Sequence, residues 1–141
     1  MTMKDIESFL KKYPDAVDYS NAPMNPDDLA HVQLALDLRF GPELKAYLLK
    51  YGYLGCMSVE LYGMNTRQGM RSDMIRQTQY LHQHFPLTRG YIALGDWGEG
   101  DYILLDSYDN VFRYRSEENK LENLREKMAD YILRIFGAEV K

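Results

Sequence analysis

The sequence predicts a single α+β domain, in which a mixed or antiparallel sheet that includes a β-meander is flanked by α-helices. Residues 90–115 contain three short apolar or alternating runs separated by turn-forming residues, which is the pattern of a meander. Five other segments carry apolar residues at the spacing of one helical face. The length of 141 residues suits one hydrophobic core, so residues 1–141 are expected to form one domain.

The first helix is expected over residues 3–13. Ile6 and Leu10 share one face of it, and Pro14 would stop it. Residues 15–24 contain turn-forming side chains and are expected to form a surface connection.

The second and third helices carry start and stop signals. Asn25 can cap a helix in which Pro26 takes the first position. The chain breaks at Gly41 and restarts at Pro42, and Gly52 supplies a left-handed stop. The apolar stripe of the third helix consists of Leu44, Tyr47, Leu48 and Tyr51. These helices are expected to cover one face of the sheet.

A strand and a fourth helix are expected in the middle of the chain. Residues 57–62 alternate with period two, which predicts a strand whose Met57, Val59 and Leu61 face the core. Residues 66–71 show no periodicity, and Ser72 with Asp73 then form a helix start.

The meander is expected to contain strands at residues 91–94, 102–105 and 111–114. Asp109 and Asn110 form a hairpin turn signal between the last two strands. Residues 95–101, between the first two, hold three glycines, three carboxylates and the only tryptophan of the chain. The meander should therefore carry an acidic, aromatic-bearing loop at one end.

The final helix is expected after a polar approach that begins at Ser116. Residues 121–135 keep helical spacing for about four turns, and Gly137 follows them. The apolar positions of this segment are Leu121, Leu124, Met128, Tyr131, Ile132 and Ile135. The charged residues 117–120 would then lie on the solvated face of a helix.

Composition narrows the classes of partner. The formal charge of −4 argues against binding the phosphates of nucleic acid and favours a basic protein partner. No apolar run approaches the roughly 20 residues of a membrane span, and the first residues lack an apolar signal core, so a cytoplasmic protein is expected. The single cysteine, Cys56, is expected to be a small core residue.

No catalytic or cofactor-binding pattern is found in the sequence. The acidic loop lacks the spacing of a calcium loop, and its glycines do not open a helix as a nucleotide site requires. His82 and His84 would point about 200° apart on a helix, and His31 stands alone. We therefore expect a protein that is not an enzyme and has no metal or other cofactor.

The order of several short motifs resembles the SUKH superfamily, also called the Smi/Knr-type domain. The matching stretches are LAHV at residues 29–32, FGPELKAYLLKYG at 40–52, LYG at 61–63, GDYILLD at 100–106 and the final helix. Gly41 departs from this pattern, because the family more often has a leucine before the proline.

This resemblance implies a SUKH-like α+β fold. Many bacterial members look like immunity proteins, which bind a toxin of a polymorphic or contact-dependent system, and fungal relatives look like regulators of cell-wall synthesis. Neither group is known for a catalytic constellation, so no active-site residue carries over. The leading hypothesis is an immunity protein against a basic toxin, such as a nuclease. The alternatives are a regulatory adaptor and, more distantly, a metal-dependent hydrolase that uses the acidic loop.

The partner-binding residues are expected in the acidic loop: Asp96, Trp97, Glu99 and Asp101. Asp96 and Glu99 would meet basic side chains, and Trp97 either anchors the loop on the sheet or forms an exposed hot spot. Asp101 and Asp106 lie closer to the strands and would hold the turns. A helical face or residues 66–71 would be the alternative binding surface.

Overall fold

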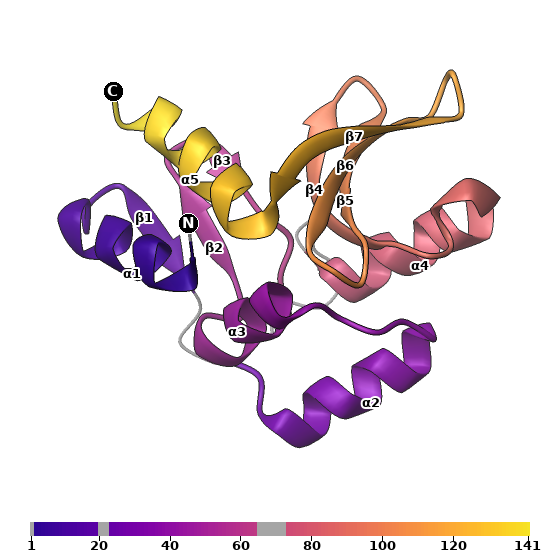
Figure 1. The fold of residues 1–141 in the computed structure, drawn as a ribbon, viewed down its shortest axis with the longest axis horizontal. Helices are drawn as coiled ribbons and strands as arrows, with labels where there is room; N and C mark the ends of the chain where they lie inside the picture. The colour runs from indigo at the N-terminus through magenta and orange to yellow at the C-terminus, as the bar shows by residue number, and fades with distance from the viewer. Residues whose placement is uncertain (1, 20–22, 65–72) are drawn as a thin grey trace.

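The computed structural model describes residues 2–19, 23–64 and 73–141, which form five α-helices and two antiparallel sheets (Figure 1). This arrangement confirms the α+β prediction. Residues 66–71, which were named as an alternative binding surface, and Ser72 of the predicted helix start lie outside these described ranges.

The smaller sheet contains β1 (Val17–Tyr19), β2 (Leu54–Cys56) and β3 (Val59–Glu60) in that order. The single strand predicted over residues 57–62 is wrong in its bounds, because Met57 and Ser58 connect β2 to β3. Met57 has a φ of 55° and is 65% exposed. The surface connection predicted over residues 15–24 is also wrong where β1 pairs with β2. Cys56 is buried, as expected.

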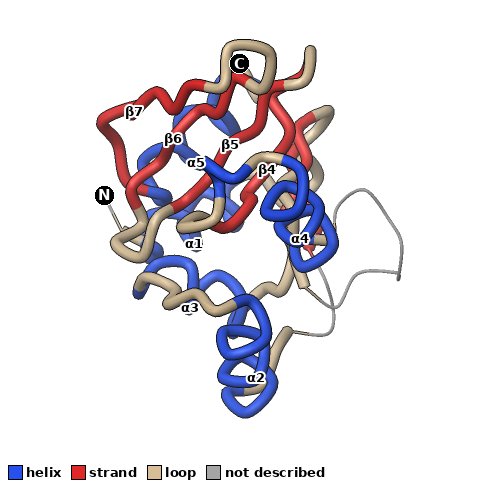
Figure 2. The backbone as a smooth tube through the Cα atoms, turned by 90° about the vertical axis from the view of Figure 1, so that its right-hand side faces the viewer, coloured by secondary structure: helices blue, strands red, loops and turns tan. Residues whose placement is uncertain are grey.

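The larger sheet is an antiparallel meander of four strands (Figure 2). They are β4 (Ile92–Gly98), β5 (Asp101–Leu105), β6 (Asn110–Arg115) and β7 (Lys120–Lys127). The three predicted strands are confirmed, although β4 continues through most of the predicted loop. A bridge between Leu61 and Gly95 joins this sheet to the segment that follows β3.

The start of the predicted final helix is instead strand β7. Its pairing with β6 is interrupted by a bulge between Asn110 and Phe112, opposite which Arg125 has a φ of 57°. Because a bulge shifts the alternation of a strand, Leu121 and Leu124 are both partly buried although they are three residues apart. Residues three apart also lie on one face of a helix, which is why this strand was predicted to be helical. The helix proper, α5 (Met128–Glu139), begins after β7 and includes Gly137.

The other helices are α1 (Met3–Lys12), α2 (Pro26–Leu36), α3 (Pro42–Lys50) and α4 (Met74–His84), with a short 3₁₀ turn, η1, at Pro86–Thr88. The predicted cap of α2 is confirmed, since Asn25 accepts a hydrogen bond from the Asp28 N–H at 2.8 Å. α3 contacts α1, α2 and α5, whereas α4 lies beside β4 (Figures 1 and 2).

One face of α3 is buried in the hydrophobic core. Leu44, Tyr47 and Leu48 are fully buried, and they share the interior with Ile132 and Phe136 of α5. The Tyr47 hydroxyl donates to the Tyr62 carbonyl at 2.8 Å and accepts from the Leu54 N–H at 3.1 Å. Burial raises the pKa of Tyr47, so this hydroxyl stays protonated and ties α3 to the smaller sheet.

A buried carboxylate joins the meander to α3. Asp109, in the turn between β5 and β6, accepts hydrogen bonds from the N–H groups of Glu43 at 2.9 Å and Leu44 at 3.0 Å. A Cβ on Gly41 would lie 2.4 Å from the Asp109 carboxylate. The glycine that departs from the family pattern therefore makes room for this cap.

Glu43 makes the next link, from α3 to α5. Its Oε1 accepts a hydrogen bond from the Ala129 N–H at 2.7 Å. Burial raises the pKa of Glu43 above its ordinary value of 4.5, and the nearby Asp109 adds to the rise, although the Ala129 bond opposes it.

Glu43→Gln should therefore change how stability depends on pH. A raised pKa in the folded state makes the stabilising contribution of Glu43 complete below pH 4.5 and lost as the pH rises through the folded pKa. Glutamine keeps an acceptor for Ala129 without a charge. The free energy of unfolding of the variant, relative to the wild type, should increase from about pH 4 to about pH 7 in urea titrations.

The control for this experiment is Glu118→Gln, which removes an exposed carboxylate in the turn between β6 and β7. The rise for Glu43→Gln should exceed any pH-dependent change for Glu118→Gln over the same range. Equal pH dependence of the two variants would contradict the prediction.

Candidate protein-interaction site

The predicted acidic loop is the end of a tight hairpin. Gly98 pairs with Asp101, which leaves Glu99 and Gly100 as a two-residue turn with φ values of 56° and 83°. Positive φ at both positions is what a type I′ turn requires. The prediction of a loop over residues 95–101 is therefore wrong for most of its length, because β4 carries Asp96 and Trp97 out to the turn.

Trp97 occupies a bulge in β4. Asp96 pairs with Tyr102 and Gly98 pairs with Asp101, so Trp97 is the extra residue between them. Bulges of this kind redirect a side chain. The indole is 42% exposed, and the Arg113 guanidinium lies 4.4 Å from its ring centroid. The Trp97 ring is therefore exposed and supported by a cation, and its role as a hot spot stays a prediction.

Asp101 holds that cation in place. Its Oδ2 accepts hydrogen bonds from Arg113 Nε at 3.0 Å and Nη2 at 2.7 Å. This ion pair is largely shielded from solvent, and it links β5 to β6 beneath Trp97. Asp101 therefore supports the hairpin, as does Asp106, which accepts hydrogen bonds from the N–H groups of Tyr108 and Asn110 in the next turn.

Asp96 and Glu99 are exposed at the hairpin end. Asp96 Oδ1 accepts a hydrogen bond from the Gly98 N–H at 2.7 Å, which orients the carboxylate beside the turn. Asp96 and Glu99 therefore place two exposed carboxylates at the end of the hairpin that carries Trp97. The four predicted residues thus come together in two pairs, with Asp96 and Glu99 outside and Asp101 beneath Trp97.

A hollow of about 410 Å³ lies next to this hairpin and adds an acid that the sequence analysis did not place there. Glu60 of β3 lines it together with Asp96 and Trp97. The Leu61–Gly95 bridge brings these segments together. No local pattern in the sequence indicates that Glu60 lies beside Asp96 and Trp97. We call Asp96, Trp97, Glu99 and Glu60 the hairpin face.

The histidine and serine side chains that could in principle bind a metal or act in catalysis make structural contacts instead. His82 Nε2 lies 2.7 Å from the Tyr91 carbonyl oxygen, and the His84 ring packs on Tyr80 at 4.5 Å. The Ser58 side chain pairs with Glu139. Within the described ranges no cluster of three or more His, Cys, Asp or Glu side chains could hold a metal ion. The absence of metal and other cofactors stays a prediction.

Comparison with known families identifies the fold. A SUKH family model, described as SMI1-KNR4 cell-wall, matches residues 3–137. The chain belongs to the SUKH superfamily. This confirms the resemblance in the motifs, and SUKH proteins are generally non-catalytic. No curated protein matches the chain. No helix among the described residues of this SUKH protein is both long and apolar enough to cross a membrane.

Proposed function

We propose that this SUKH protein is a cytoplasmic immunity protein, which binds a basic toxin domain through its hairpin face and blocks it without catalysis. The observation that carries the proposal is an exposed tryptophan held between acids. Arg113 supports one face of Trp97, Asp96 and Glu60 line a hollow together with it, and Glu99 is exposed in the adjoining turn. A rigid aromatic among complementary charges is typical of the hot spots of protein interfaces.

A nuclease toxin suits this surface, because an enzyme that binds phosphate must present lysine or arginine. Carboxylates opposite such a surface accelerate association and select against neutral partners. Asp96 and Glu99 would meet the basic side chains of the toxin, and Trp97 would supply the apolar anchor. Asp101 would act indirectly, by fixing Arg113 beneath the indole.

The alternative is a regulatory adaptor for a host protein, and the cell-wall description of the matching family model favours it. The two functions differ in their partner. Pull-down of the product of a neighbouring toxin gene would support the immunity function, whereas recovery of cell-wall synthesis proteins alone would support the adaptor.

Replacing Asp96 and Glu99 together with lysine should slow association with the toxin by about tenfold or more at low salt. It should also remove much of the salt dependence of the association rate, because the exposed charges act over the Debye length. The fold should be unaffected, since exposed charges contribute little to stability. Stopped-flow or surface plasmon resonance at several salt concentrations measures both effects.

The matched control is the replacement of Glu117 and Glu118 with lysine. These residues are adjacent on another exposed hairpin turn, so the change in net charge is identical. This variant should associate nearly as fast as the wild type. If the Asp96 and Glu99 variant is folded and still protects cells fully, the hairpin face is not the binding site, and a helical face or residues 66–71 become the alternatives.

A further inference from the structure

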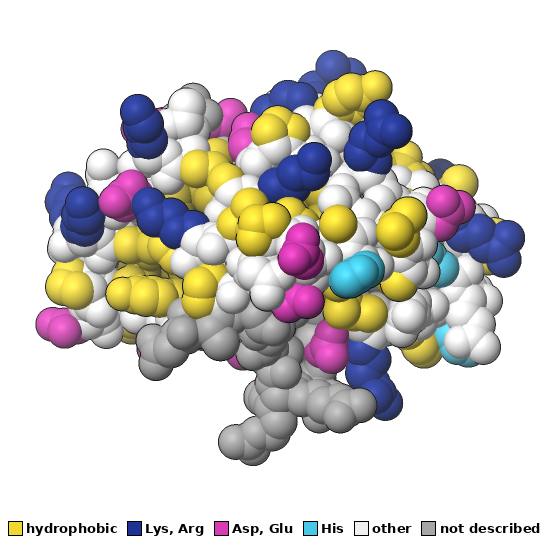
Figure 3. Space-filling view, turned by 90° about the horizontal axis from the view of Figure 1, so that it is seen from below, with side chains coloured by type: hydrophobic (Ala, Val, Ile, Leu, Met, Phe, Trp, Pro, Cys, Tyr) yellow, Lys and Arg dark blue, Asp and Glu magenta, His cyan; other side chains and the backbone are white. Residues whose placement is uncertain are grey.

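A second, independent feature is a groove of about 560 Å³ between α1, β1 and the end of α3. Its walls are apolar and include Leu10, Val17 and Tyr19. The view from below shows hydrophobic side chains gathered in a hollow at the end of the molecule where α1 and β1 lie (Figure 3). This volume falls within the range of small-molecule pockets.

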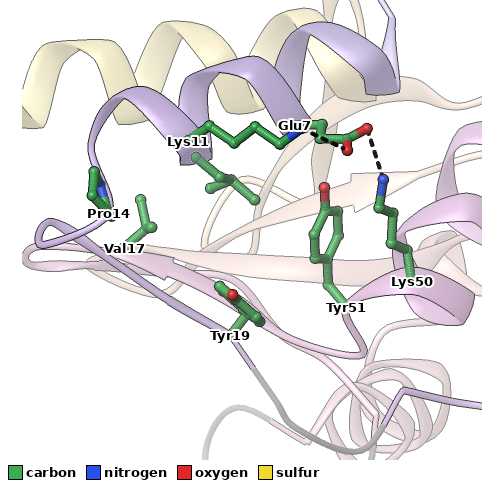
Figure 4. Close-up of a pocket in the computed structure, with 8 residues that line it drawn as sticks. Glu7, Lys11, Pro14, Val17, Tyr19, Lys50 and Tyr51 are labelled. Atoms are coloured by element: carbon green, nitrogen blue, oxygen red, sulfur yellow. Dashed lines mark ion pairs between the residues drawn. The ribbon is translucent and has the colours of Figure 1, made fainter.

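The edge of the groove carries two ammonium groups and one carboxylate. Glu7 pairs with Lys50 of α3 at 2.8 Å across the groove edge, and with Lys11 at 3.4 Å along α1 (Figure 4). The two lysines lower the pKa of Glu7, chiefly through the Lys50 contact. Hydrogen-bond donors therefore outnumber acceptors here, and the local charge is positive in a chain whose net charge is −4.

The groove also contains an unsatisfied hydroxyl. Tyr51 is only 6% exposed, and its hydroxyl is the one buried side-chain polar atom without a hydrogen-bond partner among the described residues. The ring rises beneath the Glu7–Lys50 pair and points its hydroxyl toward that pair (Figure 4). Burial raises the pKa of Tyr51, so the group is a neutral donor. A buried donor without an acceptor destabilises the fold.

We propose that this groove binds a small amphipathic monocarboxylate, with an aromatic or medium-length aliphatic body. The ligand carboxylate draws Lys50 away from Glu7 and accepts a hydrogen bond from the Tyr51 hydroxyl. The hydrocarbon lies against Leu10, Val17 and Tyr19. Its single negative charge matches the excess of one positive charge among Glu7, Lys11 and Lys50, and it supplies the acceptor that Tyr51 lacks.

The first experiment titrates the full chain with benzoate, phenylacetate, hexanoate and octanoate, followed by amide chemical shifts and calorimetry. Benzamide and hexylamine serve as neutral and cationic counterparts. The carboxylates should shift the amides of Leu10, Val17 and Tyr51 and bind about tenfold more tightly than their counterparts. Equal affinities, or shifts elsewhere only, would overturn the proposal. It would also be overturned if the groove amides respond to the toxin domain and to none of the carboxylates.

Variants test the roles of the polar groups. Tyr51→Phe keeps the ring but removes the hydroxyl, so affinity should fall about five- to tenfold while the melting temperature stays the same or rises. A role of Tyr51 confined to packing would leave affinity unchanged. Glu7→Gln removes the competing carboxylate and should strengthen binding, whereas Lys50→Gln should weaken it about tenfold.

The control is Lys120→Gln, which makes the same change of charge at an exposed position at the start of β7, outside the groove lining. It should leave affinity for the carboxylates near that of the wild type. If Lys120→Gln and Lys50→Gln weaken binding equally, the effect is one of net charge, and the proposed site is wrong.

Discussion

Replacing Leu48 with alanine is expected to lower the free energy of unfolding by about 2 to 5 kcal/mol. Leu48 is fully buried, together with Leu44 and Tyr47 of the same helix. Helices α1, α2 and α5 contact α3, so the surroundings cannot easily collapse into the cavity that the substitution leaves. Urea denaturation of the wild type and the variant measures the loss, provided that the slope of the transition is unchanged.

Leu34→Ala provides the matched control, because it removes the same atoms from a leucine that is 79% exposed on α2. Its free energy of unfolding should change by no more than about 0.5 kcal/mol. An unchanged stability of Leu48→Ala would show that α3 buries a different face from the one described.

The elements predicted best are those whose signals are local. The starts of α2 and α3 depend on Asn25, Pro26 and Pro42, which act on the first helical turn in which they lie. Gly52 has the positive φ that its role as a helix stop predicted. Because these contacts span only a few residues, a short sequence pattern is enough to predict them.

The smaller sheet depends on pairing between strands that are far apart in the sequence, which a local residue pattern cannot predict. β1 has only three residues and gains its partner from β2, which begins 35 positions later in the chain, after two helices. The alternation at residues 57–62 crosses the connection between β2 and β3, so one period-two pattern covers two different structures. Burial of Leu61 was predicted correctly, but exposure of Met57 was not.

The residues of the hairpin and of the strands that support it also divide into those that a local sequence pattern identifies and those that it does not. Asp96, Trp97, Glu99 and Asp101 were found together because they are neighbours in the sequence. Arg113 was missed, because its contact with Asp101 depends on the register of β5 and β6, which places it diagonally across the strand pair. Trp97 lies at a bulge in β4, and no local residue pattern predicts a bulge at this position. Its exposure therefore could not be predicted from the sequence.

The second large effect is expected at Asp109, where substitution by alanine should lower the free energy of unfolding by about 3 kcal/mol. This carboxylate is 1% exposed and caps the first turn of α3 with two hydrogen bonds. Alanine would leave both N–H groups without an acceptor at the positive end of the helix. It would also be strained at the φ of 65° that Asp109 adopts.

The comparison for this loss is Asn25→Ala, which removes the exposed cap of α2 and should cost about 1 kcal/mol. Asp109→Asn should fall between the two, because asparagine tolerates positive φ but offers one acceptor oxygen in place of two. Equal stabilities of Asp109→Ala and the wild type in urea denaturation would contradict a capping role for the buried carboxylate.

Gly41 tests the same contact from the other side. Its φ of −73° suits any residue, so the glycine is required for space, since a Cβ would lie 2.4 Å from Asp109 Oδ1. Gly41→Ala should therefore displace the carboxylate and remove most of the stability that the cap provides. The double variant Gly41→Ala with Asp109→Ala should lose less than the sum of the single losses, by about 1 kcal/mol or more. Strictly additive losses would show that alanine at Gly41 acts without disturbing Asp109.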